Sequence, residues 1–126
     1  MQTLSEENYL KAIYHLEKQG LKKITPTAMA EALSNNPASV VDMIRKLVDK
    51  KLLQYEKSKG VKLTEKGRNI AIQVVRKHRL WEAFLVDKLG YGWDEIHEIA
   101  EQLEHVQHPD LADRLDSFLE FPQYDP

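Results

Sequence analysis

Residues 25–67 read TPTAMAEALSNNPASVVDMIRKLVDKKLLQYEKSKGVKLTEKG, and they specify two short helices and a hairpin in close succession. Either Thr25 or Thr27 can cap the first helix, and SNNP at 34–37 forms a tight polar break after it. A second helix, PASVVDMIRKLVDKK, follows at once, because a proline at a helix start lacks only an N–H that would be unpaired there. Two short helices joined by such a turn are the helix-turn-helix arrangement.

A basic hairpin follows the second helix. In LLQYEKSKGVKL (52–63), apolar and polar residues alternate on both sides of a Lys-Ser-Lys-Gly centre, which predicts two short β-strands. A helix-turn-helix followed directly by a hairpin is a winged helix. On the N-terminal side, apolar spacing predicts an amphipathic helix from Ser5 to about Lys18, with Ser5 as its N-cap and Gly20 at its end.

On the C-terminal side the pattern is helical throughout. A long helix of about residues 65–89 ends at a Gly-Tyr-Gly break, a second helix spans 93–106, and a third spans 110–121 and ends at Pro122. The predicted fold is therefore mainly α, with a winged-helix domain at 1–68 and a helical domain at 69–126, linked by the long helix.

Composition narrows the function classes. The chain has 126 residues, 42% hydrophobic and 30% charged, as is ordinary for a globular protein. The absence of cysteine excludes disulfides, cysteine-zinc sites and thiol catalysis. No window resembles a membrane span, and the start lacks the features of a secretory signal, so we expect a cytoplasmic protein with no membrane partner.

Charge is distributed unevenly along the chain. Residues 40–68 carry nine basic and four acidic side chains, net +5, whereas residues 69–126 carry five basic and twelve acidic, net −7. A basic segment joined to an acidic one suits a polyanion-binding half coupled to a cation-binding half. The alternative is chance clustering of solvated charges.

Histidine and glutamate recur in the acidic half at helical spacing. His97, Glu101, Glu104 and His105 have offsets of 0, +4, +7 and +8, which fall on one face of an α-helix, and the preceding helix offers a further pair, His78 and Glu82. Imidazole and carboxylate are the ligands of a divalent transition metal. Six such groups converging would leave uncompensated charge without a cation, so we predict a metal site. His15 and His108 lie outside the pattern, and we interpret them as surface residues.

The helix-turn-helix and the basic hairpin are predicted to bind double-stranded DNA. The N-terminal residues of the second helix in such units reach base edges in the major groove. The predicted base contacts are Asn36, Ala38, Ser39 and Asp42. The predicted phosphate contacts are Arg45, Lys46, Lys50 and the hairpin residues Lys57, Lys59 and Lys62.

Residues 5–121 resemble the diphtheria toxin repressor and manganese transport regulator family of metal-dependent repressors. The resemblance lies in SEENYLKAIYHL, NNPASVVDMIRKL, GVKLTEKG, and RKHRLWEAFL combined with HEIAEQLEHV. It implies a transcriptional repressor of metal-ion homeostasis whose C-terminal helical domain binds metal and forms a homodimer. Long family members continue into a proline-rich linker and a small β-barrel, so the resemblance also implies that this chain stops before a further C-terminal domain.

The resemblance also implies specific ligands. Glu101, Glu104, His105 and, from the first helix, Asn8 match the regulatory site, whereas His78, Glu82 and His97 match an ancillary site. In manganese-type members the His78 position instead joins the main cluster. Iron-type members have cysteine and methionine at the Glu101 and Asn8 positions, and manganese-type members have acids at Glu101, Asn8 and Lys11. This chain keeps only the acid at Glu101. Oxygen and imidazole donors favour Mn²⁺ or Fe²⁺, and Zn²⁺ or Co²⁺ binding in vitro is also expected.

Three other functions compete with a metal-dependent repressor. The first is a winged-helix regulator that senses a small molecule and ignores metal. The second is a metallohydrolase, because His/Glu clusters can activate water, although the chain lacks a separate general base. The third is a protein-interaction module that binds neither DNA nor metal.

Overall fold

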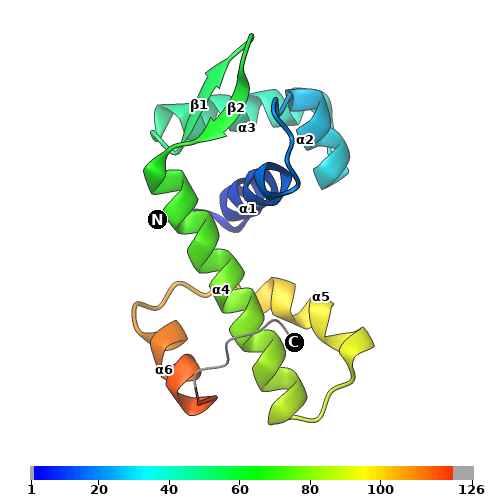
Figure 1. Cartoon of the computed structure of the whole chain (residues 1–126), viewed down its shortest axis with the longest axis vertical. Helices are drawn as coiled ribbons and strands as arrows, with labels where there is room; N and C mark the ends of the chain where they lie inside the picture. The colour runs from blue at the N-terminus through cyan, green and yellow to red at the C-terminus, as the bar shows by residue number, and fades with distance from the viewer. Residues whose placement is uncertain (1, 121–126) are drawn as a thin grey trace. The chain divides into compact units, whose positions relative to one another are not determined.

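The computed structural model describes residues 2–120, which form six helices and one two-stranded sheet (Figure 1). The elements in chain order are α1 Leu4–Lys18, α2 Pro26–Leu33, α3 Pro37–Asp49, β1 Leu53–Glu56, β2 Gly60–Leu63, α4 Glu65–Asp87, α5 Trp93–Leu103 and α6 Leu111–Phe118. They divide between an N-terminal unit, residues 1–72, and a C-terminal unit, residues 73–126, with α4 running through the boundary. The predicted mainly α fold with an N-terminal winged helix is confirmed.

The core of the N-terminal unit is formed by the apolar faces of α1, α2 and α3 and by the hairpin. In α3, Val40 and Leu47 are 0% exposed and Ile44 is 4% exposed, whereas Met43 on the same face is only partly buried. Tyr9, Leu10 and Ile13 of α1 join them in one cluster with Met29, Leu52, Leu53 and Val61. Burial of this many large apolar side chains is what holds the three helices together.

The hairpin has the two predicted strands. Leu53 pairs with Leu63, and Glu56 pairs with Gly60 across the Lys57–Lys59 turn. The Val61 N–H also donates to the Ile24 carbonyl at 2.8 Å, so residue 24 extends the sheet edge and fixes the hairpin to the helix-turn-helix.

The N-cap of the first helix lies two residues earlier than expected. Thr3, not Ser5, is its N-cap: the Thr3 hydroxyl accepts from the Glu6 N–H, and the Glu6 carboxylate accepts from the Thr3 N–H at 2.8 Å. This reciprocal capping box satisfies two N–H groups at the helix start, which Ser5 would not. For α2, Thr25 rather than Thr27 is the cap, and its hydroxyl accepts from the Ala28 N–H.

The helices of the C-terminal unit are shorter than predicted. The long helix ends at Asp87, α5 ends at Leu103 rather than 106, and α6 spans Leu111–Phe118 rather than 110–121. The chain leaves α5 in a tight turn, with the Val106 N–H bonded to the Leu103 carbonyl, and Pro109 follows. Pro122 and the FPQYDP segment lie outside the described residues.

The C-terminal unit has a smaller core around Leu85, Ile96 and Ala100. Arg76 of α4 holds α6 in place by donating to Asp113 at 2.9 Å and Asp116 at 3.2 Å. Partial burial acts to lower the pKa of Arg76, but its hydrogen bonds to the two carboxylates outweigh this and raise the pKa, so the side chain stays charged.

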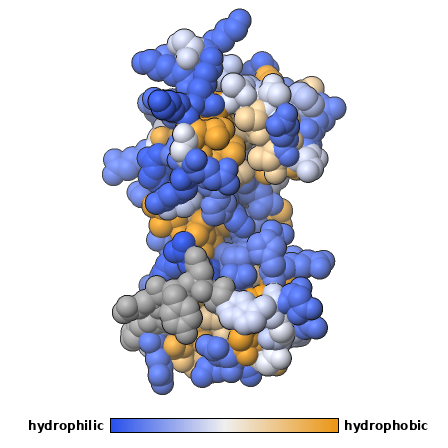
Figure 2. Space-filling model, turned by 45° about the vertical axis from the view of Figure 1, so that its right-hand side comes forward, coloured by the Kyte–Doolittle hydropathy of each residue, from blue (hydrophilic) through white to orange (hydrophobic). Residues whose placement is uncertain are grey.

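Hydrophilic side chains cover most of the face shown in Figure 2, with small apolar areas between them. Within residues 2–120, no helix combines the length and the apolar character that crossing a membrane requires.

Candidate metal centre and nucleic-acid interface

Two neighbouring helices of the C-terminal unit supply the predicted ancillary ligands. His78 and Glu82 lie one turn apart on α4, so their side chains share one face, and each side chain is only 12–13% exposed. His97 comes from the second turn of α5, and its side chain is 67% exposed. The local sequence accounts for this position, because Asp94 and Glu95 stabilise the start of α5 just before it.

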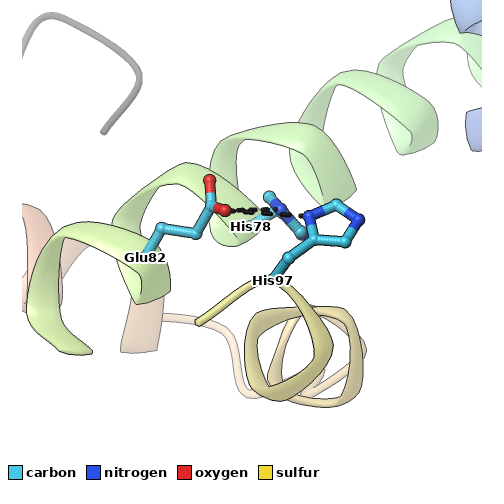
Figure 3. A group of neighbouring side chains, drawn as sticks. All are labelled: His78, Glu82 and His97. Carbon is cyan, nitrogen blue, oxygen red and sulfur yellow. Dashed lines mark ion pairs between the residues drawn. The ribbon is translucent and has the colours of Figure 1, made fainter. Parts of the chain in front are cut away.

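These three side chains meet around the Glu82 carboxylate (Figure 3). Glu82 Oε2 lies 3.3 Å from His78 Nε2 and 3.8 Å from His97 Nδ1, and the two imidazole centroids are 5.0 Å apart. One potential ligand atom from each residue lies within 4.8 Å of the others. Two imidazole nitrogens and one carboxylate oxygen at this separation can converge on a single cation.

The residues predicted for the regulatory site extend the same cluster. Glu104 Oε1 lies 2.8 Å from His78 Nδ1, and Glu104 Oε2 lies 3.9 Å from His105 Nε2. On the other side, His97 Nε2 lies 2.9 Å from Glu101 Oε1. The structure therefore brings all six predicted ligands of this unit into one continuous series of imidazoles and carboxylates.

The expectation that His97, Glu101, Glu104 and His105 share one helical face is wrong at its C-terminal end. Glu104 is the C-cap of α5, and His105 lies in the turn after it. Lys77 of α4 donates to the Val106 carbonyl at 3.1 Å and anchors the turn that follows the helix. The side chains of His97 and Glu101 are 67% and 52% exposed, whereas those of Glu104 and His105 are 0% and 6% exposed.

The donor set fits a divalent metal on two structural grounds. Glu104 is a fully buried carboxylate at the C-terminal end of a helix, where the helix dipole disfavours negative charge. It therefore needs positive charge or hydrogen-bond donors nearby, and imidazoles lie on both its oxygens. All six side chains offer nitrogen or oxygen and none offers sulfur, which suits Mn²⁺ or Fe²⁺ better than thiophilic ions.

Asn8 belongs to the N-terminal unit. It is half-buried on α1 between the buried residues Glu7 and Tyr9. Its assignment as a metal ligand stays a prediction. His15 and His108 are exposed, as expected.

The predicted DNA-contacting residues are all exposed on the N-terminal unit: Asn36, Ala38, Ser39, Asp42, Arg45, Lys46 and Lys50 on or beside α3, and Lys57, Lys59 and Lys62 on the hairpin. Asn36 also has a structural role, because its side chain accepts from the Ala38 N–H at 2.8 Å and caps α3. Lys50 likewise forms an ion pair with buried Glu6 at 2.9 Å. Asp42 lies 4.0 Å from Arg45 in a weak exposed pair.

Several residues that position these surfaces were missed from the sequence. Asn35 ties the turn to α1 by donating to the Tyr9 hydroxyl at 2.8 Å, and Arg68 pairs with Glu17. Pairs between residues far apart in the chain leave no signal in the local sequence. Thr3 could have been found, because Thr-x-x-Glu is the capping-box pattern.

Two family models cover almost the whole chain. Residues 1–61 match "Iron dependent repressor, N-terminal DNA binding domain", and residues 64–126 match "Iron dependent repressor, metal binding and dimerisation domain". Neither model describes an enzyme.

Individual relatives agree with these matches. The iron-dependent repressor IdeR of Mycobacterium tuberculosis is 38% identical over 120 residues, which is 95% of this chain and 52% of the relative. The HTH-type transcriptional regulator MntR of Geobacillus kaustophilus is 37% identical over 126 residues, 99% of this chain and 87% of the relative. The chain thus spans about half the length of the IdeR relatives and most of the MntR relative.

A solved structure of a manganese-dependent transcriptional repressor in complex with manganese has a similar fold. It superposes with a TM-score of 0.85 at 40% identity, over 96% of this chain and 55% of that chain.

Proposed function

The chain belongs to the iron-dependent repressor family, and on this basis we propose that it is a transcriptional repressor whose binding to operator DNA depends on a divalent cation. The proposed cation is Mn²⁺ or Fe²⁺, and the proposed partners are double-stranded DNA and a second copy of the chain. We place its action in the cytoplasm, with no catalytic activity and no membrane partner.

The single observation that carries the proposal is the His/Glu series of the C-terminal unit. Six side chains of the right chemistry form a series in which each lies within 3.9 Å of the next, and three of them have ligand atoms within 4.8 Å of one another. When bound, a divalent cation supplies positive charge that neutralises these carboxylates and joins ligands from separate segments. His78, Glu82 and His97 would hold one ion, and Glu101, Glu104 and His105 would hold another.

The N-terminal unit supplies the DNA-binding surface. Ala38, Ser39 and Asp42 of α3 are exposed where a recognition helix meets base edges, and the exposed hairpin lysines are placed to contact phosphates. Because Asn36 caps α3, its base contact would have to come from the amide nitrogen, while its oxygen keeps the cap.

We further propose that Asn8 of α1 completes the regulatory site. A ligand from α1 would make the arrangement of the DNA-binding unit depend on cation binding at the other unit. In a dimer, half-sites one helical turn apart, about 34–36 Å, require a defined spacing of the two recognition helices. The cation would then select the DNA-competent state through its higher affinity for that state.

The test is DNA binding measured by fluorescence anisotropy on genomic fragments, with Mn²⁺, anaerobic Fe²⁺, Zn²⁺ or chelator. We expect DNA binding only with metal. Glu101→Ala or His105→Ala should abolish this metal dependence without loss of helical content. Glu98→Ala, an exposed position on the same helix, is the matched control.

Other outcomes favour other functions. Equal DNA binding with metal and with chelator would support a winged-helix regulator that ignores metal and senses another small molecule. Full metal dependence in both Glu101→Ala and His105→Ala would overturn the assignment of the regulatory ligands. Asn8→Ala with unchanged metal dependence would overturn the role of α1 alone.

A further inference from the structure

Three side chains connect α1 to the start of α3 by a series of hydrogen bonds. Tyr9 of α1 is 3% exposed, and its hydroxyl accepts from Nδ2 of Asn35 at 2.8 Å. Oδ1 of Asn35 accepts from the Asn36 N–H at 2.8 Å, and Oδ1 of Asn36 accepts from the Ala38 N–H at 2.8 Å. The N-cap of α3 is therefore connected to a tyrosine that is fixed in the core of the N-terminal unit.

These hydrogen bonds determine which way both amides face. A backbone N–H can only donate, so the atom next to it must be the amide oxygen, and the nitrogen of the same amide faces away from it. In Asn35 that nitrogen meets the Tyr9 hydroxyl. In Asn36, which is exposed, the nitrogen faces away from the helix start and carries two N–H donors.

We propose that Tyr9 and Asn35 hold the amide of Asn36 so that it presents only N–H donors to the major groove, and that α3 therefore rejects cytosine at the base position which Asn36 reads. This inference rests on the proposed function and deepens it, because it assigns a chemical class of base to one contact. Tyr9 and Asn35 are positioning residues, whereas Asn36 contacts the base.

The class of base follows from the edges that the major groove exposes. Guanine offers N7 and O6 as acceptors, adenine offers N7 and thymine offers O4, whereas cytosine offers only the donor at N4. Two donors that face each other form no hydrogen bond, and both lose the water that satisfied them. An amide that could rotate would turn its oxygen toward cytosine, but in Asn36 that rotation breaks the cap of α3.

The turn before α3 also has backbone hydrogen bonds of its own. The Asn35 N–H donates to the Ala30 carbonyl at 3.0 Å, and the Asn36 carbonyl accepts from the Val40 N–H at 3.0 Å. The side chains of Tyr9 and Asn35 add an anchor for the residue that caps α3. A contact that is oriented before binding loses less freedom on binding, which increases affinity for the correct sequence.

The experiment is the selection of bound sequences from a randomised library of DNA duplexes by wild type, Asn36→Asp and Asn36→Ser, with Mn²⁺ or anaerobic Fe²⁺, whichever supports DNA binding. Both substitutions keep a residue that caps helices well. Aspartate presents only acceptors, which suit cytosine N4. We expect one base position at which wild type depletes cytosine and Asn36→Asp enriches it at least about fivefold. Asn36→Ser should lose the preference at that position.

Tyr9→Phe tests the positioning role, because it keeps the buried ring and removes only the hydroxyl. It should bind the sequence selected by wild type about three- to tenfold more weakly, the effect of one lost hydrogen bond, with non-specific DNA binding and its salt dependence unchanged. Asn35→Ala should act alike, and the double variant should lose no more than Asn35→Ala alone. Tyr14→Phe, at a partly buried position on the same helix, is the matched control and should bind as wild type does.

The possible failures are distinguishable. If Asn36→Asp selects the same bases as wild type, Asn36 only caps α3 and the proposal is wrong. Where Asn36→Asp binds too weakly to select sequences, an unchanged preference in Asn36→Ser has the same meaning. Equal losses of specific and non-specific binding in Tyr9→Phe, with helical content retained, would overturn the positioning role. A wild-type chain that binds no DNA with any cation overturns the proposed function as well.

Discussion

Glu6 shows how a single buried charge is stabilised in the N-terminal unit. Its side chain is 1% exposed, yet it accepts from the Thr3 N–H at 2.8 Å and from Lys50 Nζ at 3.0 Å. Burial acts to raise the pKa of this carboxyl, but the Thr3 and Lys50 interactions outweigh burial and hold the pKa below its ordinary value of 4.5. One residue thus caps α1 and joins it to the end of α3.

At pH 7, Glu6→Gln should lower the free energy of unfolding by about 1–2 kcal/mol, because it weakens the cap and a charge-assisted hydrogen bond. A lowered folded-state pKa means that this stabilisation is fully present above the unfolded-state value and is lost as pH falls through the folded-state value. The difference between variant and wild type should therefore shrink below about pH 4.5, as measured by urea unfolding from pH 3 to 7.

Glu31→Gln, at an exposed position on α2, should change the free energy of unfolding by less than about 0.5 kcal/mol at pH 7. A Glu6→Gln effect of equal size at pH 3 and pH 7 would show that the ionised carboxylate is not what stabilises α1.

At this scale the sequence predicted the chemistry of residues better than their partners. Spacing predicted that His78 and Glu82 share one face of their helix, because a helix period fixes which side chains lie together. The grouping of this pair with His97 came from the family resemblance. Spacing could not predict that Glu104 is buried against His78, or that Lys50 reaches Glu6 across 44 positions, because both depend on tertiary packing.

The hairpin of β1 and β2 is tightly constrained where β2 begins. Gly60 begins β2 with φ at +80°, and a Cβ placed there would lie 2.6 Å from the Ile24 carbonyl oxygen. The next residue, Val61, donates to that same carbonyl. The close approach of two backbones therefore requires glycine, both for its left-handed conformation and for its missing side chain.

Gly60→Ala should lower the free energy of unfolding by about 2–4 kcal/mol, since backbone strain and a steric clash add together. Gly20→Ala is the matched control, because Gly20 has φ at +87° and a Cβ at this position would meet no atom within 4 Å. It should cost only about 1 kcal/mol, the strain alone. Chemical denaturation of both variants measures the difference, and equal losses would mean that contact with Ile24 contributes nothing.

Helix existence was predictable and helix ends were less so. Apolar spacing located all six described helices and the hairpin, because periodicity reports which face is buried. The end of α5 was missed, and the turn after it is anchored by a tertiary contact, from Lys77 of α4 to the Val106 carbonyl, that has no signal in the local sequence. That turn carries His105 and places it inward, so the error fell on a candidate ligand.

At the scale of the whole chain, basic and acidic side chains are concentrated in different segments. The net +5 of residues 40–68 coincides with α3 and the hairpin, and the net −7 of residues 69–126 coincides with the His/Glu series. The predicted phosphate contacts therefore lie on the N-terminal unit, and the predicted metal ligands other than Asn8 lie on the C-terminal unit, so variants in the two sets should affect different observables.

Salt dependence separates the two kinds of variant. Lys59 of the hairpin is 65% exposed and pairs only weakly with Glu56, at 3.8 Å, so it can be released to a phosphate at little cost. Lys59→Gln should reduce the slope of log K against log salt by about 0.9 at saturating Mn²⁺, with Mn²⁺ affinity in the absence of DNA unchanged. Lys88→Gln removes the same charge at an exposed site outside the predicted contacts and should leave the slope unchanged.

Glu101→Ala should act through cation binding, because it changes which state is populated and removes no phosphate contact. If cation binding selects the DNA-competent state, the wild-type salt slope should be steeper with Mn²⁺ than with chelator, since only that state places both recognition helices and wings on the duplex. Glu101→Ala should then give the shallow chelator slope at every Mn²⁺ concentration. A Glu101→Ala slope that steepens with Mn²⁺ as in wild type would mean that DNA contact and cation binding are linked through residues other than Glu101.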